Sequence, residues 1–351
     1  MPVLPKVSVI LTSYNHEKYI CEAIDSVLDQ SFSDFELIIW DDASTDSSWN
    51  LIQQYTDHRI KAFRNDVRKR GAFGINKSIA EIAKGEYIAI HHSDDVWDSN
   101  KLEKQIAVFN TQPELDAVFT WVQIIDEHGS LQENDWFNEK ETSRWQHLEN
   151  LFKMRNHLAH PSAMVKKRTY QELGFYRNFL PRSGDAEMWS RLAIKHSIYV
   201  VPEKLTIHRL FSDQSNSSGK RPEVKVQTEN EWNFLRSNYL TIDNFDNLVS
   251  VFPSLEHFRK DEKFNTKFLL AMVCINECSD TAAWRLGISW LYDLFRDPSQ
   301  ALEISDLYSF TYQDLVKLTI GADAFELPDS IKTQVDLDAS VADPSAPRPN
   351  M

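Results

Sequence analysis

Short apolar runs and amphipathic stretches alternate four times within the first 90 residues of this 351-residue chain. The apolar runs are rich in β-branched and aromatic residues and stop at polar or turn-forming residues, as buried parallel strands do. They predict strands at 7–13, 35–40, about 59–65 and 86–90. Because helical spacing follows each run, the alternation predicts parallel βαβ units and an α/β fold with a doubly wound, mostly parallel sheet.

The segments between these strands carry apolar stripes that are typical of amphipathic helices. We expect Asn15 to cap the first helix, whose stripe consists of Ile20, Ala23, Ile24, Val27 and Leu28. Further along, the pattern predicts a helix at 98–110, a strand at 116–122, a turn at 125–131, a helix at 186–195 and an interrupted strand at 198–210.

A polar segment at 212–223 separates the α/β part from a region with helical periodicity throughout. We expect an α/β domain at 1–220, a helical extension at 221–333 and a disordered tail at 334–351. One stripe in the extension suits packing on the α/β domain, dimerisation or contact with a membrane surface: Trp284, Ile288, Leu291 and Phe295. Membrane contact is less favoured, because the polar face is not rich in Lys or Arg.

The net charge and the cysteine content restrict the expected cellular location and the expected binding partners. A net charge of −14 argues against a nucleic-acid partner, because polyanions bind clustered Lys and Arg. Three cysteines are too few for a disulfide framework, and the N-terminal segment lacks the charged start of a signal peptide. No apolar run approaches the roughly 20 residues that span a bilayer. We therefore expect a cytoplasmic protein.

Two adjacent carboxylates, Asp94 and Asp95, directly follow the strand at 86–90 in the motif HHSDD. Adjacent carboxylates repel each other unless a cation or several donors neutralise them. Oxygen ligands suit Mg²⁺ or Mn²⁺, which commonly bridge protein carboxylates to substrate phosphates. The alternative is that Asp95 or Asp98 caps the helix that begins near residue 99.

A second acidic pair, Asp41 and Asp42, follows the strand at 35–40. A carboxylate there suits a nucleobase N–H, with Thr12 and Tyr14 flanking the ring from the end of the first strand. The alternative is again a capped helix, with the serine or threonine at 44–45 as its cap.

Four cations lie close together in this acidic chain, at Arg64, Arg68, Lys69 and Arg70. They suit a diphosphate, and a predicted helix begins just beyond them, although a solvated face is the simpler interpretation. The glycine patterns of dinucleotide-binding folds and P-loops do not occur at the required places, so neither is supported.

Two later motifs add a pair of carboxylates and a histidine–arginine pair. Asp185 and Glu187 lie at the start of a predicted helix and point to different faces, so at most one of them reaches a given pocket. A carboxylate there suits a general base. The alternative is that both only provide favourable negative charge at the N-terminus of the helix. His208 and Arg209 end the last predicted strand, where they suit a metal-diphosphate site.

Residues 5 to 218 closely resemble the inverting family 2 glycosyltransferases of the GT-A fold, of the type that makes cell-surface polysaccharides. Four blocks carry the resemblance: VSVILTSYNHEKYICEAIDSVLDQSFSDFELIIWDDASTD, GEYIAIHHSDDVWDSNKLEKQ, GDAEMWSRLA and HRLFSDQSNS. The resemblance implies a GT-A domain followed by the helical extension.

The resemblance also implies roles for the strand-end residues. Asp42 would face the base of a nucleoside-diphosphate sugar, and Asp185 would be the catalytic base, with Glu187 as second choice. The remaining nucleotide-binding candidates are Thr12, Tyr14, Glu17, Asp41, Arg70, Ser93, Asp94 and Arg209. The expected ligands of Mn²⁺ or Mg²⁺ are Asp94, Asp95 and His208.

The chain departs from the family pattern at three places. His92 replaces the leading aspartate of the metal motif, and Gly184 replaces the glutamate before the base. Phe211 replaces a histidine, so either His208 substitutes for it or the site lacks that ligand.

The implied activity is metal-dependent transfer of a hexose from a nucleoside-diphosphate sugar, most simply a UDP-sugar, with inversion at the anomeric carbon. The acceptor would be a hydroxyl of a saccharide or lipid-linked saccharide, with peripheral contact at the cytoplasmic membrane face and possible oligomerisation through the extension. Two alternatives stay open: a catalytically lapsed nucleotide-sugar-binding or scaffold subunit, and a nucleotidylyltransferase. The absence of a glycine-rich basic loop after the first strand counts against the latter.

Overall fold

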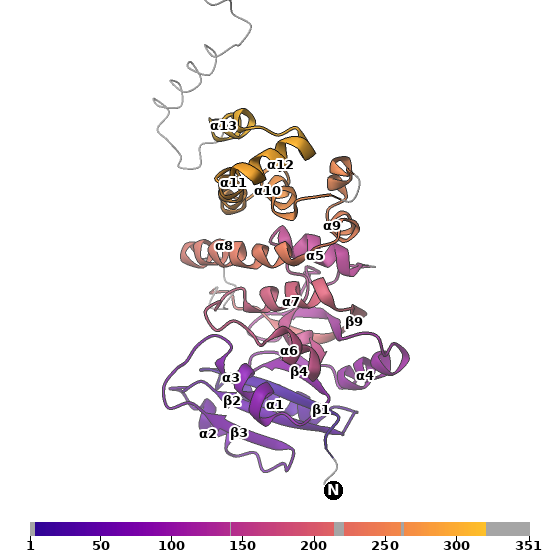
Figure 1. The fold of residues 1–351 in the computed structure, drawn as a ribbon. Coiled ribbons are helices and arrows are strands. Elements are labelled where there is room, and N and C mark those ends of the chain that lie inside the picture. The colour runs from indigo at the N-terminus through magenta and orange to yellow at the C-terminus, as the bar shows by residue number, and fades with distance from the viewer. Residues whose placement is uncertain (1–3, 141, 214–220, 261–262, 321–351) are drawn as a thin grey trace, which may run out of the picture. The chain divides into compact units, whose positions relative to one another are not determined.

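The computed structural model describes residues 4–140, 142–213, 221–260 and 263–320 (Figure 1). It divides the chain into two compact units, Met1–Tyr239 and Leu240–Met351. The division falls later than the expected boundary at residue 220, because α8 (Pro222–Arg236) packs against α5 (Arg144–Phe152) and α7 (Gly184–Lys195) of the first unit (Figure 1).

The first unit is built on one nine-stranded sheet with the order β3-β2-β1-β4-β8-β6-β9-β5, and β7 pairs with β6. Neighbours are parallel from β3 to β4 and again between β6 and β9, whereas β8, β5 and β7 pair antiparallel. The predicted α/β class with a mostly parallel sheet is therefore confirmed. The strands are β1 (Val7–Ser13), β2 (Phe35–Asp41), β3 (Ile60–Arg64), β4 (Tyr87–His92), β5 (Val96–Trp97), β6 (Ala117–Ile125), β7 (Leu131–Gln132), β8 (Met164–Lys166) and β9 (Ile198–Arg209).

Helices α1 (Ile20–Leu28) and α4 (Lys101–Thr111) cover the sheet face formed by alternate residues of β1. Val9 and Leu11 of β1, Ile24 of α1 and Leu102 of α4 share one core cluster and are fully buried. Each such side chain contributes about 1.5–3 kcal/mol of burial free energy. The remaining α-helices of this unit, besides α5, α7 and α8, are α2 (Ser48–Ile52), α3 (Phe73–Lys77) and α6 (Lys167–Leu173). A π-helical turn lies at Ser78–Ile82, and 3-10 turns lie at His160–Ser162 and Ser237–Thr241, the last of which crosses the boundary between the units.

The predicted Asn15 cap is wrong, and the alternative cap at 44–45 does not form, because the Asn15 and Ser44 side chains make hydrogen bonds in the loops instead. Helix α1 begins after Tyr19, and Asn15 adopts a left-handed φ of 55° while its side chain accepts the backbone N–H of Thr45. Helix α2 begins after Ser47, because the Ser44 hydroxyl and N–H bind the Asp41 carboxylate. The Asn15 contact ties the loop after β1 to the loop after β2.

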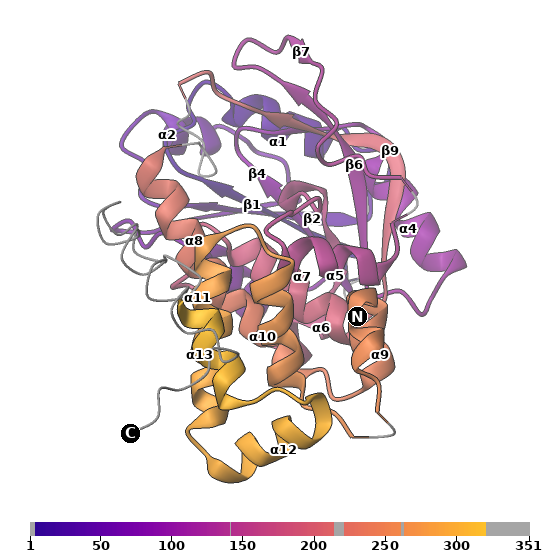
Figure 2. The same ribbon diagram turned by 90° about the horizontal axis from the view of Figure 1, so that it is seen from above.

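Strands β6 and β9 run side by side over nearly their full length (Figure 2). The register shifts on both sides of Trp121, and β9 is one continuous strand with an irregular pairing rather than the interrupted strand predicted at 198–210. The predicted turn at 125–131 joins β6 to β7. This arrangement brings the end of β9, with His208 and Arg209, beside the end of β6.

The second unit is helical in its described residues: α9 (Phe245–Val251), a 3-10 turn at Pro253–Phe258, α10 (Thr266–Asn276), α11 (Thr281–Phe295), α12 (Pro298–Tyr308) and α13 (Tyr312–Ile320). Gly287 allows α11 to approach α10 closely, because a Cβ atom there would lie 2.8 Å from the Ala271 carbonyl oxygen. Of the predicted stripe, Ile288 and Leu291 are buried, whereas Trp284 and Phe295 are half-buried.

Among the described residues, no helix is both long and apolar enough to cross a membrane. The predicted tail at 334–351 lies outside them.

Candidate active site

The polar clusters of the sequence gather where the strand order reverses. Strand β1 lies between β2 and β4, so the loops after β1, β2 and β4 diverge from a common edge of the sheet. Ligands of open α/β sheets bind at such an edge. The Ser93 N–H donates to the Thr12 carbonyl at 3.2 Å, which joins the ends of β1 and β4.

Asp95 is the fully buried centre of the cluster after β4. Its Oδ1 atom accepts a hydrogen bond from the Arg209 backbone N–H at 3.0 Å and lies 2.8 Å from His208 Nδ1. Its Oδ2 atom lies 3.3 Å from His92 Nδ1 and has no hydrogen-bond partner among the described residues. Burial alone would raise the pKa of Asp95, but His208 and His92 hold it below its ordinary value.

The pKa of the neighbouring carboxylate, Asp94, is shifted in the opposite direction. Burial and the charge of Asp95 raise the pKa of Asp94, which has His16 Nδ1 at 3.9 Å as a nearby cation when protonated. Potential ligand atoms of His92, Asp94 and Asp95 lie within 4.8 Å of one another. The repelling carboxylates and the unpartnered Asp95 oxygen fit a divalent cation that accepts oxygen and imidazole ligands, such as Mn²⁺.

The alternative of a helix cap does not hold for Asp95. Helix α4 begins at Lys101 after Asn100, and it is Asp98 whose carboxylate accepts the Asn100 N–H at 2.9 Å. Asp95 is directed instead toward residues at the end of β9.

Arg209 is built into the wall behind the carboxylates and is 2% exposed. Its guanidinium pairs with Glu22 at 2.7 Å and donates to the Asp94 carbonyl at 3.0 Å. It also lies over the Tyr19 ring, 4.5 Å from the centroid. Arg209 therefore fixes the backbone at Asp94.

The acidic pair after β2 organises loops. Asp42 accepts hydrogen bonds from the backbone N–H groups of Lys69 and Arg70, at 2.8 and 2.9 Å, and from the Asn65 amide at 2.7 Å. Asp41 is fully buried, binds the Ser44 N–H and hydroxyl, and lies 3.4 Å from Arg64 Nε. The basic segment is thereby held against the end of β2.

The loop after β1 contributes two further predicted residues, Tyr14 and Glu17, and its His16 contacts a third, Ser93, which follows β4. The Arg68 guanidinium lies over the Tyr14 ring, 3.4 Å from its centroid. Glu17 accepts the Ser47 N–H at 2.8 Å, so its carboxylate holds the turn before α2. Ser93 is buried, and its hydroxyl lies 2.8 Å from His16 Nδ1.

The two carboxylates at the start of α7 have different surroundings, as their spacing predicts. Glu187 is fully buried and pairs with Arg191 through both oxygens, at 2.7 and 2.8 Å. Asp185 is half-buried and accepts one hydrogen bond from the Asn156 amide at 3.0 Å. Burial raises the pKa of Asp185, partly offset by the Ala186 N–H and the charge of His92. A carboxylate with a raised pKa suits proton acceptance.

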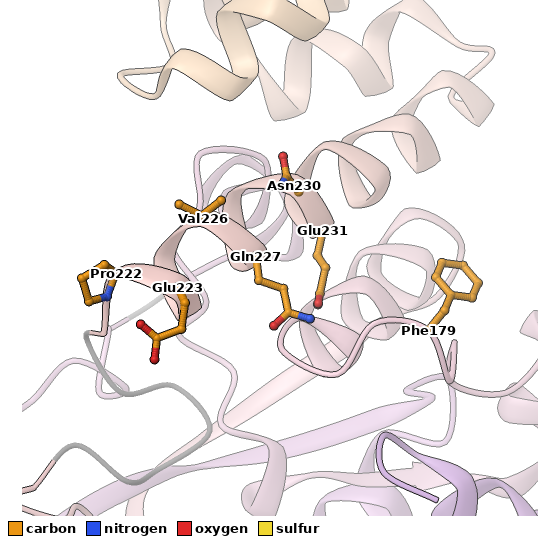
Figure 3. A pocket seen from close by; sticks show the side chains of 7 residues that line it. All are labelled: Phe179, Pro222, Glu223, Val226, Gln227, Asn230 and Glu231. Carbon is orange, nitrogen blue, oxygen red and sulfur yellow. The ribbon is translucent and has the colours of Figure 1, made fainter.

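Helix α8 supports the segment that leads into α7. The Glu231 carboxylate accepts the backbone N–H groups of Arg182 and Ser183 at 2.9 and 2.8 Å. Beside it lies an open hollow of about 570 Å³, lined by one face of α8 and by Phe179, which is 62% exposed (Figure 3). The residues at its wall therefore contact the segment immediately before Asp185.

Sequence reasoning did not assign His16, Asn156 or His160, and it treated His92 only as a departure from the family pattern. His16 contacts Ser93, and His160 contacts His92. Asn156 contacts Asp185. Only His92, which belongs to the HHSDD motif, offered a local signal.

Comparison with known proteins agrees with this geometry. Residues 8–173 match Glycosyl transferase family 2. Over 196 residues the chain is 30% identical to the Escherichia coli O-antigen biosynthesis glycosyltransferase WbnJ, covering 54% of this chain and 72% of WbnJ. Over 106 residues it is 40% identical to the Escherichia coli UDP-Glc:alpha-D-GlcNAc-diphosphoundecaprenol beta-1,3-glucosyltransferase WfaP, covering 30% of this chain and 42% of that enzyme.

The fold has solved counterparts as well. A crystal structure of S. aureus TarS 1-349 in complex with UDP aligns with a TM-score of 0.57 at 17% identity, covering 90% of this chain and 89% of TarS. This likeness supports the fold class, and the sequence matches include both strands that carry the acidic pairs. The chain thus belongs to glycosyl transferase family 2 and has the GT-A fold expected of that family.

Proposed function

We propose that this protein transfers a hexose from a nucleoside-diphosphate sugar to a hydroxyl of a saccharide or lipid-linked saccharide, with inversion at the anomeric carbon. The observation that carries the proposal is the adjacent carboxylates Asp94 and Asp95 at the sheet edge where the strand order reverses. The pKa of Asp94 is raised and the pKa of Asp95 is lowered. A third carboxylate, Asp185, lies on a separate helix. This arrangement would supply a cation site and a proton acceptor on different elements.

Asp94, Asp95 and His92 would hold Mn²⁺ or Mg²⁺, with His208 fixing the other oxygen of Asp95. When bound, the cation supplies positive charge that stabilises the departing nucleoside diphosphate. Thr12 of β1 and Tyr14 in the loop after it would contact the nucleoside.

The segment from Asn65 to Arg70 would close the donor site from the side of β2. Its backbone is held by the Asp42 carboxylate, and its Lys and Arg side chains are exposed. Exposed cations in this position suit the anionic diphosphate.

On the acceptor side, Asp185 would accept the proton of the attacking hydroxyl. Its raised pKa, its single side-chain hydrogen bond and its partial exposure favour this role over Glu187, whose two oxygens already bind Arg191. Direct attack on the anomeric carbon from the face opposite the leaving group inverts the configuration.

The names of the relatives support the choice of substrates. WfaP is named for a UDP-glucose donor and a diphosphoundecaprenol-linked acceptor, and WbnJ for O-antigen biosynthesis. A UDP-sugar donor and a role in surface-polysaccharide synthesis, on the cytoplasmic face of the membrane, are therefore proposed here. The shared segments cover less than half of WfaP, so donor and acceptor need direct assay.

A thermal-shift panel tests the donor site. UDP, GDP, dTDP and CMP are each added with Mn²⁺, Mg²⁺ or EDTA, and a ligand at a hundredfold excess over its Kd stabilises the fold by about 2.7 kcal/mol. We expect UDP with Mn²⁺ to raise the melting temperature of the wild type but not of Asp95→Asn. Turnover of the matching UDP-sugar to an inverted product then separates a transferase from a lapsed subunit. The absence of any shift with any nucleotide would refute the proposal.

A further inference from the structure

A chain of rings leads from the carboxylate pair into the interior of the first unit. His92 Nε2 lies 2.9 Å from His160 Nδ1, and His160 Nε2 lies 3.0 Å from the Tyr176 hydroxyl. The Tyr176 hydroxyl in turn lies 3.0 Å from the hydroxyl of Tyr170. Tyr176 and Tyr170 are buried, and His160 also packs against the fully buried Trp189, with ring centroids 5.8 Å apart. The position of the His160 ring is therefore set by packing.

The first link of this chain faces the candidate cation site. His92 presents Nδ1 to Asp95 Oδ2, the buried oxygen that lacks a hydrogen-bond partner among the described residues. Unlike a carboxylate, which offers two equivalent oxygens, an imidazole offers one lone pair in the plane of its ring. His92 therefore serves as a ligand only if its ring is oriented and its hydrogen is on the other nitrogen.

The chain of rings satisfies both requirements when each hydrogen bond is donated away from the carboxylate pair, from His92 toward Tyr170. If Nδ1 of His92 carries the lone pair, Nε2 carries the hydrogen and donates to His160 Nδ1. His160 then donates from Nε2 to the Tyr176 oxygen, and Tyr176 donates to the Tyr170 oxygen. In this direction the three donors, His92, His160 and Tyr176, each have an acceptor at 2.9 to 3.0 Å.

We propose that His160 is a positioning residue for the metal site: it accepts the Nε2 hydrogen of His92 and thereby holds Nδ1 toward the cation, while Tyr176 fixes the orientation of His160. The inference rests on the proposed donor site. Histidine ligands commonly donate their second N–H to such a partner, and loss of that partner typically weakens metal affinity 10- to 100-fold.

The test measures Mn²⁺ affinity of the full chain by calorimetry in the presence of UDP. His160→Phe keeps a ring but removes the acceptor, and we expect the Mn²⁺ Kd to rise roughly 10- to 100-fold. His160→Asn retains an amide oxygen near the Nδ1 position and should restore most of the affinity. Tyr176→Phe should give a smaller loss, and His92→Ala a loss at least as large as that of His160→Phe.

Tyr55→Phe is the matched control, because its hydroxyl bonds Asp25 on α1, away from this chain of rings. Its Mn²⁺ affinity should equal that of the wild type. Unchanged affinity in His160→Phe or in His92→Ala overturns the inference while the proposed function stands. If the wild type itself binds no nucleotide with any metal, the proposed function fails instead. Should His160→Phe not fold, the losses of Mn²⁺ affinity expected in Tyr176→Phe and His92→Ala decide the matter, and wild-type affinity in both variants overturns the inference.

Discussion

Glu231 of α8 accepts the backbone N–H of Ser183 at 2.8 Å, two residues before the proposed base. The same carboxylate oxygen accepts the N–H of Arg182. A helix distant in sequence thus satisfies two backbone donors at the start of α7, a place where helices leave N–H groups unpaired.

Replacing this carboxylate should destabilise the first unit. We expect Glu231→Ala to lower the free energy of unfolding by about 1–3 kcal/mol, because two backbone donors lose their acceptor. Glu231→Gln keeps an acceptor oxygen and should lose much less. Urea unfolding of the full chain measures the difference. Glu223→Ala on the same helix is the control, since that side chain is 71% exposed, and an equal loss there would contradict the argument.

Asp185→Asn should abolish transfer without removing donor binding. Loss of a general base typically costs about 10²- to 10⁴-fold in rate, whereas the nucleotide contacts lie on other elements. The assay compares turnover of the UDP-sugar with the UDP-induced thermal shift. Retained turnover in Asp185→Asn would assign the base elsewhere.

The pH dependence of Asp185 gives an independent check. Burial raises the pKa of Asp185 in the folded chain. Above this raised pKa the buried carboxylate lowers the free energy of unfolding, and the loss shrinks to zero as the pH falls from the raised pKa to the ordinary pKa of an aspartate. Asp185→Asn should therefore be more stable than the wild type at neutral pH, with the gap closing in acid. Glu187→Gln should be less stable, because Arg191 loses its ion pair. Chemical unfolding across a pH series measures both, and a destabilised Asp185→Asn would contradict the burial argument.

The loop held by Asp42 should become mobile when its acceptor is removed. In Asp42→Ala, the N–H groups of Lys69 and Arg70 lose their partner, and the exposed basic residues there are trypsin sites. We expect faster tryptic cleavage at 68–70 and a nucleotide Kd about tenfold higher, equivalent to about 1.4 kcal/mol. Mass spectrometry of a digestion time course locates the cuts. The exposed neighbour Asp66, changed to Ala, should behave like the wild type.

His147 should make the fold sensitive to acid. Burial, together with nearby His157, lowers the pKa of His147 to about 4. The unfolded chain therefore binds a proton that the folded chain does not between about pH 6.5 and 4, and stability falls by about 3 kcal/mol over that range. His147→Leu should lose less stability than the wild type over that range, whereas the exposed His128→Leu should not differ from it. Parallel slopes for the wild type and His147→Leu would refute the assignment.

Local pattern was sufficient for much of the fold. The run at 7–13 forms β1 with the predicted bounds, and the stripe from Ile20 to Val27 is buried as expected. Such features follow from residue spacing within one element. Neither Asn15 nor Ser44 caps a helix, because both make contacts between loops, which spacing does not reveal.

The sequence by itself determined the alternation of strands and helices, the placement of acidic residues at strand ends, and through them the family. Only the tertiary structure decided which side chains meet. Asp95 contacts His208 across 113 residues, because β9 pairs with β5 directly after Asp95. His92 contacts His160 across 68 residues, because the turn at His160–Ser162 packs against β4. Periodicity is a property of neighbouring residues, whereas a site is assembled by sheet order and burial, which depend on the packing of the whole unit.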